Sequence, residues 1–124
     1  LPGGGVVRSI LLPHGSEPTL GLIFEEPSTG TKFVYYTDCK TVPTPAVNLA
    51  LDCDLAILDG LRPNFHPTHM TIGKACEVAG EIRAKQAYVT HMTYQIDYAT
   101  YTESLAKEFP KVGLCYDGLR IQLG

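Results

Sequence analysis

The chain has 124 residues, of which 44% are hydrophobic and 19% are charged, and its formal net charge is −3 at pH 7. This length suits one compact domain and is too short for two, so residues 1–124 are predicted to form a single domain. The slightly acidic balance argues against nucleic-acid binding by bulk charge, and no apolar run is as long as the roughly 20 residues of a membrane span.

The first third of the chain is predicted to contain three strands. Residues 6–12 are apolar and β-branched, and this strand stops at Pro13-His14-Gly15 because proline lacks a ladder donor and glycine permits a turn. Residues 20–25 and residues 32–37 are further strand candidates on either side of a Pro-Ser-Thr-Gly turn. We therefore expect a hairpin whose second strand carries Asp38 at its end.

The rest of the chain is predicted to alternate helices and strands. An apolar run at residues 54–58 is typical of a strand buried on both faces, and apolar residues at helical spacing after the N-cap Thr71 predict an amphipathic helix. In chain order the expected elements are a short helix at 44–51, the strand at 54–58, a loop at 62–69, the helix up to residue 82, a strand at 86–90, a helix at 98–109 and a closing hairpin with strands at 112–115 and 119–123. This order indicates an α/β architecture with helices packed on a sheet.

Every histidine of the chain, together with one aspartate, lies at the end of a predicted strand or in a loop that follows one. These residues are His14, Asp38, His66, His69 and His91. In α/β sheets ligand sites gather where strands end, and imidazole with carboxylate suits a divalent ion such as Zn²⁺, Mn²⁺ or Fe²⁺. Loop histidines without a function are also common, and Asp38 is equally placed to cap a turn. No His-x-His or His-x-x-x-His pair occurs, so the fold must bring these side chains together.

The four cysteines are widely spaced and form no Cys-x-x-Cys pair. This pattern favours neither a zinc knuckle nor a redox pair. We expect free, buried thiols in a reducing cytoplasm. The cysteines are Cys39, Cys53, Cys76 and Cys115.

Several short motifs occur in the order in which one protein superfamily carries them. They are Pro13-His14-Gly15, Leu20-Gly21, Tyr36-Thr37-Asp38-Cys39, Asp54-Leu55-Ala56-Ile57-Leu58-Asp59, His66-Pro67-Thr68-His69, Thr90-His91-Met92, Ile96-Asp97-Tyr98 and Tyr116-Asp117-Gly118-Leu119. The chain resembles the metallo-β-lactamase superfamily, and within it the branch of the phosphoribosyl cyclic phosphate phosphodiesterase of phosphonate breakdown, with ribonuclease Z as a more distant relative. The resemblance covers nearly the whole chain. It implies the carboxy-terminal half of an αββα sandwich, with a mixed sheet and helices packed on one face.

The resemblance also implies a two-metal site that hydrolyses a phosphodiester. By position, His14 and His91 match histidine ligands, and Asp38 matches the carboxylate that bridges two divalent ions, zinc or manganese. His69 matches a substrate-side histidine that donates a proton or contacts phosphate, with His66 as the second choice. In this superfamily the ions lower the pKa of the water that attacks phosphorus.

The sequence also departs from the family pattern. The signature His-x-His-x-Asp-His, which supplies most ligands from the amino-terminal half, does not occur, and Thr93-Tyr94 stands where relatives often carry a second histidine. Three ligands of a two-metal set leave open coordination positions, so metal affinity should fall. The chain opens with Leu1-Pro2-Gly3-Gly4-Gly5 and no initiator Met, as expected if it begins inside a loop of something longer. No signal peptide is expected, because this opening has no charged region followed by an apolar one. Asp97 is placed either to cap the helix that follows or to accept a bond from His91.

Three functions are compatible with these residues. The first is a metal-dependent hydrolase of a small-molecule phosphodiester, incomplete without a missing amino-terminal half as its partner. The second is a non-catalytic half-domain that pairs with a second copy of the chain and buries the sheet face that the other half would cover. The third is a hydrolase of thioesters, lactones or β-lactams, because the superfamily's fold does not fix its substrate.

Overall fold

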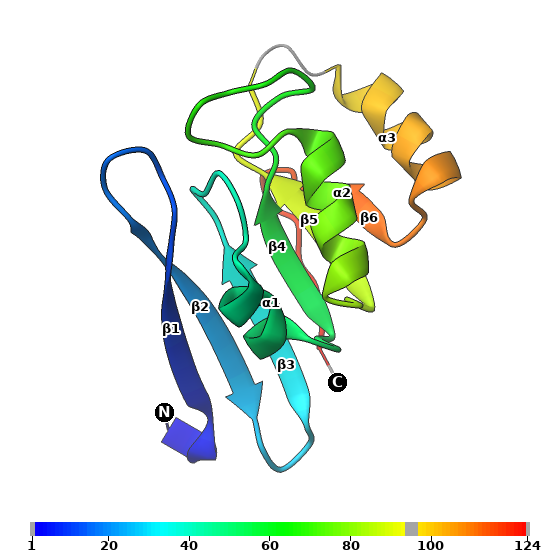
Figure 1. The fold of residues 1–124 in the computed structure, drawn as a ribbon. Coiled ribbons are helices and arrows are strands. Elements are labelled where there is room, and N and C mark those ends of the chain that lie inside the picture. The colour runs from blue at the N-terminus through cyan, green and yellow to red at the C-terminus, as the bar shows by residue number, and fades with distance from the viewer. Residues whose placement is uncertain (1, 94–96, 124) are drawn as a thin grey trace.

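A computed structural model describes residues 2–93 and 97–123, so Tyr94 lies outside the described residues. The chain forms one mixed sheet with helices packed against it (Figure 1). Its elements are a 3-10 turn at Pro2–Gly4, β1 (Val6–Leu12), β2 (Thr19–Glu26), β3 (Thr31–Tyr36), α1 (Thr44–Ala50), β4 (Leu55–Asp59), α2 (Ile72–Glu81), β5 (Gln86–Thr90), α3 (Tyr98–Glu108) and β6 (Val112–Leu114). The strands and helices predicted up to residue 114 are thus confirmed, with boundaries shifted by at most one residue.

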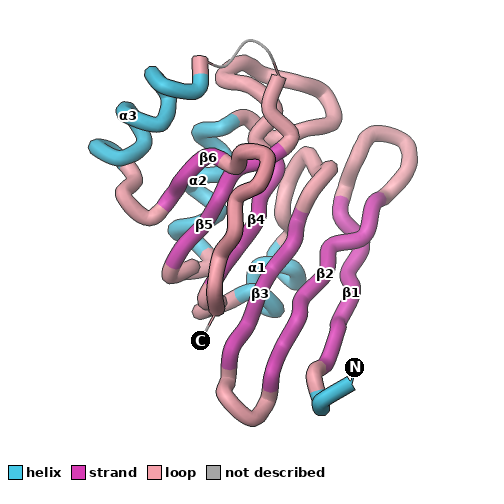
Figure 2. Tube along the Cα trace, turned by 180° about the vertical axis from the view of Figure 1, so that it is seen from behind, coloured by secondary structure: helices cyan, strands magenta, loops and turns pink. Residues whose placement is uncertain are grey.

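The sheet places its strands side by side in chain order, from β1 to β6. β1, β2 and β3 pair antiparallel, whereas β3, β4, β5 and β6 pair parallel. Parallel neighbours need a crossover, and here each crossover contains one helix. Figure 1 shows α1 and α2 in front of the sheet, and Figure 2 shows the opposite face crossed by the segment after β6. The mixed sheet with helices on one face is therefore confirmed.

The core fills the space between the sheet and the helices α1 and α2. All five residues of β4, the strand in the middle of the parallel part, are buried. The fully buried Tyr36 donates its hydroxyl to the carbonyl of Ala46 in α1, at 2.7 Å. The predicted N-cap of α2 is confirmed because Thr71 Oγ1 accepts the backbone N–H of Lys74 at 3.1 Å.

The predicted closing hairpin is wrong in its second arm. Only Val112–Leu114 forms a strand, and residues 119–123 have no strand structure. A tight turn does form, with the N–H of Leu119 bonded to the carbonyl of Tyr116 at 3.0 Å. A three-residue strand offers few ladder bonds to a partner, and Ile121 and Leu123 stay 37% exposed instead of packing into the sheet.

Asp97 occupies the predicted N-cap position of α3, but its side chain does not cap the helix backbone. Its carboxylate accepts the hydroxyl of Thr100 at 2.8 Å instead.

None of the helices in the described ranges combines the length and apolar character needed to cross a bilayer.

The face of the sheet opposite α1 and α2 is apolar at its antiparallel end. Strand pairing puts alternate residues of β1, β2 and β3 on this face, away from the buried Ile23 and Val34. The phenyl rings of Phe24 and Phe33 stack there with centroids 5.5 Å apart. We call this set the apolar sheet face; its members are Val7, Leu11, Leu20, Leu22, Phe24, Phe33 and Tyr35. Leu11 and Leu20 are 62% and 57% exposed, and apolar patches of this kind mark interaction surfaces.

The glycine that follows β4 tests how closely this segment packs against β5. A methyl group at Gly60 would clash with Cγ1 of the fully buried Val89. We expect Gly60→Ala to lower the free energy of unfolding by about 1–3 kcal/mol, because overpacking forces buried groups to shift. Gly80→Ala is the matched control in α2, where the added methyl group meets no atom, and should raise stability by about 0.5–1 kcal/mol. Urea unfolding measures the stability of both variants against the wild type. A Gly60→Ala variant as stable as the wild type would contradict this packing.

Candidate functional site

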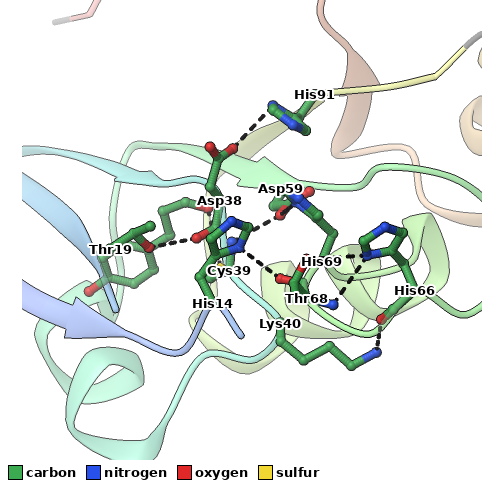
Figure 3. A network of polar contacts seen from close by, with 11 residues as sticks. His14, Thr19, Asp38, Cys39, Lys40, Asp59, His66, Thr68, His69 and His91 are labelled. Carbon is green, nitrogen blue, oxygen red and sulfur yellow. Dashed lines mark hydrogen bonds and ion pairs between the residues drawn. The ribbon is translucent and has the colours of Figure 1, made fainter. Parts of the chain in front are cut away.

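The polar residues of the candidate site lie at one edge of the sheet. β3, β4 and β5 run parallel, so their carboxyl ends meet at this edge. Asp38 lies just after β3, Asp59 is the last residue of β4, and His91 directly follows β5. His14, from the loop after β1, and His69, from the loop after β4, complete the group (Figure 3).

Asp38 and His91, both predicted metal ligands, are in direct contact. Nδ1 of His91 lies 3.1 Å from Oδ1 of Asp38. His69 joins them, because one ligand atom from each of Asp38, His69 and His91 lies within 4.8 Å of the other two. Two imidazoles and a carboxylate suit a borderline divalent ion. The chemistry and spacing of these three donors therefore fit a metal ion.

Both residues of the Asp38–His91 pair adopt a backbone conformation that L side chains rarely take. The φ angle is 31° at Asp38 and 68° at His91. Such strain costs of order 1–3 kcal/mol and persists only where the surroundings impose it, often at functional sites. At Asp38 the surroundings are fixed by the two N–H groups that follow it. That of Cys39 donates to Oδ2 of Asp59 at 2.9 Å, and that of Lys40 donates to the carbonyl of Pro13 at 2.8 Å.

A buried carboxylate orients the imidazole of His69. Nδ1 of His69 lies 2.6 Å from Oδ2 of Asp59, and the two residues are 8% and 0% exposed. Burial raises the pKa of the Asp59 carboxyl above its ordinary value, and the bonds from Cys39 and His69 offset part of that rise. The contact assigns the Nδ1 proton to the bond with Asp59, so Nε2 is the ring atom left for an ion or a substrate.

Asp59 was not predicted as a site residue, because it reads as the polar end of an apolar strand. The available signal was an ionisable group directly after the four apolar residues Leu55, Ala56, Ile57 and Leu58. In the described part of the chain, Oδ1 of Asp59 is buried without a hydrogen-bond partner. A buried and partly unsatisfied carboxylate destabilises a fold, which is consistent with a functional role.

His14 and His66 flank His69 without joining the group of three. The ring of His14 meets that of His69 edge-on at 4.6 Å, and its Nδ1 lies 3.0 Å from the carbonyl of Thr68. The ring of His66 lies 5.0 Å from that of His69, and its Nδ1 accepts the N–H of Thr68 at 3.1 Å. Desolvation and the charge of Arg62 lower the pKa of His66. The metal-binding role of His14 stays a prediction.

Known proteins share this fold. Residues 2–92 match the family described as the beta-lactamase superfamily domain, and the chain belongs to that family. Among solved structures, it is similar to a diphosphatase of the PhnP family, with a TM-score of 0.85 and 25% identity over 97% of this chain and 44% of that one. It is also similar to the short form of human tRNase Z, with a TM-score of 0.78 and 23% identity over 98% of this chain and 44% of that one.

One curated protein is also similar in sequence. An octanoyltransferase of Porphyromonas gingivalis is 27% identical over 114 residues, which cover 91% of this chain and 22% of that protein. The chain thus spans less than half the length of each of these relatives. The fold class predicted from the sequence, half of a metallo-β-lactamase sandwich, is confirmed. Membership of this superfamily supports a hydrolase.

Metal titration tests the role of the Asp38–His91 pair. We expect Asp38→Ala and His91→Ala each to weaken Co²⁺ or Zn²⁺ binding by at least about tenfold, because each removes one of few donors. His66→Gln is the matched control, since it changes a neighbouring imidazole outside the group of three. Calorimetric titration of chelator-treated protein provides the measurement. Unchanged affinity in both alanine variants would rule out a metal ion at this pair.

Proposed function

We propose that the chain is the carboxy-terminal half of a metal-dependent hydrolase that cleaves a small-molecule phosphodiester. The observation that carries this proposal is the contact of Asp38 with His91 beside a buried Asp59–His69 pair. Family membership supports hydrolysis, and the similarity to a diphosphatase supports chemistry at phosphorus. We also propose that, within the superfamily, the chain belongs to the branch of the cyclic phosphate phosphodiesterase.

In the proposed site two divalent ions, zinc or manganese, are shared between this half and a second one. Asp38, whose carboxylate has two oxygens to share, would hold both ions, and His91 and His14 would each hold one. When bound, the ions lower the pKa of the attacking water and offset charge on the phosphate. The remaining ligands come from a partner segment, since the chain spans 44% of the structures that it resembles.

His69 is the proposed proton donor, in place of the ligand role that its closeness to Asp38 and His91 would also allow. When the ester P–O bond breaks, the leaving alkoxide takes the proton from Nε2 of His69. The Asp59 carboxylate, 2.6 Å from Nδ1, holds the ring in place and stabilises the cationic form that carries both protons. His66, whose ring lies 5.0 Å away, is the second choice for this role.

The leaving group distinguishes a proton donor from a metal ligand. We expect His69→Gln, in the longest natural polypeptide that contains these residues, to lower kcat for adenosine 2′,3′-cyclic phosphate by about 10²–10⁴-fold. The loss should be much smaller for bis(p-nitrophenyl) phosphate, because nitrophenolate leaves without protonation. Metal content should stay at the wild-type level, and Asp38→Ala should abolish both activities.

Two outcomes would count against this role and this reaction. Loss of metal in His69→Gln would make His69 a ligand instead of a proton donor. Turnover of a thioester, lactone or β-lactam without turnover of either phosphodiester would favour the alternative hydrolase of the same superfamily. An acyl substrate is also relevant because one relative is named an octanoyltransferase, although the similarity covers only 22% of that protein.

A second candidate function, a half-domain that associates, is favoured by the apolar sheet face. Its partner is either the missing amino-terminal half or a second copy of the chain. Burial of exposed leucine and aromatic side chains supplies the driving force for association. Leu20 should contribute strongly to this association, because it is 57% exposed and pairs with the exposed Leu11.

Sedimentation velocity tests this association. We expect the wild-type chain to sediment faster than a monomer and Leu20→Lys to shift it to a monomer, because a charge on the apolar sheet face opposes its burial. Ala106→Lys adds the same charge to the exposed surface of α3 and should leave the distribution unchanged. A wild-type chain that is monomeric at all concentrations would remove self-association as a function.

The cysteines support the proposed cytoplasmic location. All four thiols are unpaired, and Cys39, Cys53 and Cys76 are buried. Burial raises the pKa of Cys39 to about 12 and those of Cys53 and Cys76 to about 11. These thiols are therefore protonated and unreactive near neutral pH, as expected for packing residues in a reducing compartment.

A further inference from the structure

The loop between β4 and α2 presents a large aromatic ring to solvent. Phe65 is 70% exposed, the highest value among the large apolar side chains of the described residues. Exposed phenylalanine gains no packing energy in this position, and single exposed apolar residues are common. Phe65 differs from such isolated residues in the contacts that its loop makes with neighbouring side chains.

Two cationic side chains fix the loop around Phe65. The ammonium of Lys40 lies 3.9 Å from the centroid of the ring, and its Nζ also donates to the carbonyl of His66 at 2.5 Å. Figure 3 shows Lys40 reaching this loop from the segment that carries Asp38. Nη2 of Arg62 donates to the carbonyl of Phe65 itself at 2.7 Å. One face of the ring is thus covered by a cation, and the high exposure leaves the other face open.

This ring lies at the rim of the candidate site. Phe65 is next to His66, whose ring contacts that of His69, and Lys40 is two residues after Asp38. Lys40 and Arg62 also place two positive charges here in a chain whose net charge is −3. An open aromatic face beside two cations favours a ligand that combines a planar ring with a negative charge.

We propose that Phe65, Lys40 and Arg62 form a subsite that binds a planar ring carried on a phosphate ester, such as a nucleobase or an aryl group. The ring of the ligand stacks on the open face of Phe65, and the cations attract the phosphate. Phe65 is then a residue that determines specificity. This role rests on the proposed phosphodiester chemistry, but the binding itself needs no metal.

Two phosphodiesters of equal charge test the subsite on the metal-free chain. Diphenyl phosphate carries planar rings and dimethyl phosphate carries none. We expect the wild type to bind diphenyl phosphate about fivefold more tightly or better, the effect of one stacked ring. Phe65→Ala should lose this preference, and Phe65→Tyr should keep it. NMR titration gives the affinities, with the shifted amides expected in residues 62–69.

Tyr116→Ala is the matched control, because it removes an aromatic ring that is 56% exposed on another segment and should keep the preference. Thermal unfolding checks that Phe65→Ala is folded, as its exposure leads us to expect. The proposal is overturned if the wild type shows no preference for the ring, or if Phe65→Ala keeps it. It is also overturned if Phe65→Ala alters sedimentation without altering ligand binding, since Phe65 would then be a protein contact.

The subsite and the proposed function fail separately. Ring-dependent binding without metal-dependent hydrolysis of any phosphodiester would remove the hydrolase and keep the subsite. Hydrolysis that depends on Asp38, together with equal binding of diphenyl phosphate and dimethyl phosphate, would remove the subsite and keep the hydrolase.

Discussion

The parallel alignment of β3, β4 and β5 is the constraint on which the candidate site depends. The register pairs Tyr36 with Leu58 and Asp59 with Thr90, so the three strands end at nearly the same level. Because successive strand residues face opposite sides, a slip of one residue would turn these ends away from each other. The buried strand β4 in the middle fixes this register, since a slip would move its polar final residue to the sheet face that packs against α1 and α2.

The segment just after β3 connects the remaining parts of the site. Its backbone bonds to the loop after β1 through Pro13, to β4 through Asp59, and to the loop before α2 through Met70. A strained backbone at Asp38 is tolerated because these contacts hold the segment on three sides. The buried Asp59–His69 pair is also explained by the site and not by stability. Buried ionisable pairs add little net stability, so the role of this pair is to orient the imidazole of His69.

Local patterns in the sequence were enough to predict most of the fold. The β-branched residues and turn signals of β1–β3, the apolar run of β4 and the helical spacing after Thr71 each specify an element without long-range information. The second arm of the closing hairpin failed because a turn signal at Asp117-Gly118 does not guarantee a partner strand. Side-chain contacts were harder to foresee: the ends of strands indicated Asp38 and His91, but the pairing of Asp59 with His69 depends on how the loop after β4 folds back.

The most direct test of the account is a crystal structure of the protein loaded with Zn²⁺ or Mn²⁺, with the ion located by its anomalous scattering. The account predicts an ion about 2.0–2.2 Å from an oxygen of Asp38 and a nitrogen of His91, in place of the direct contact between these two residues. An ion bound elsewhere, with Asp38 and His91 still paired to each other, would contradict it.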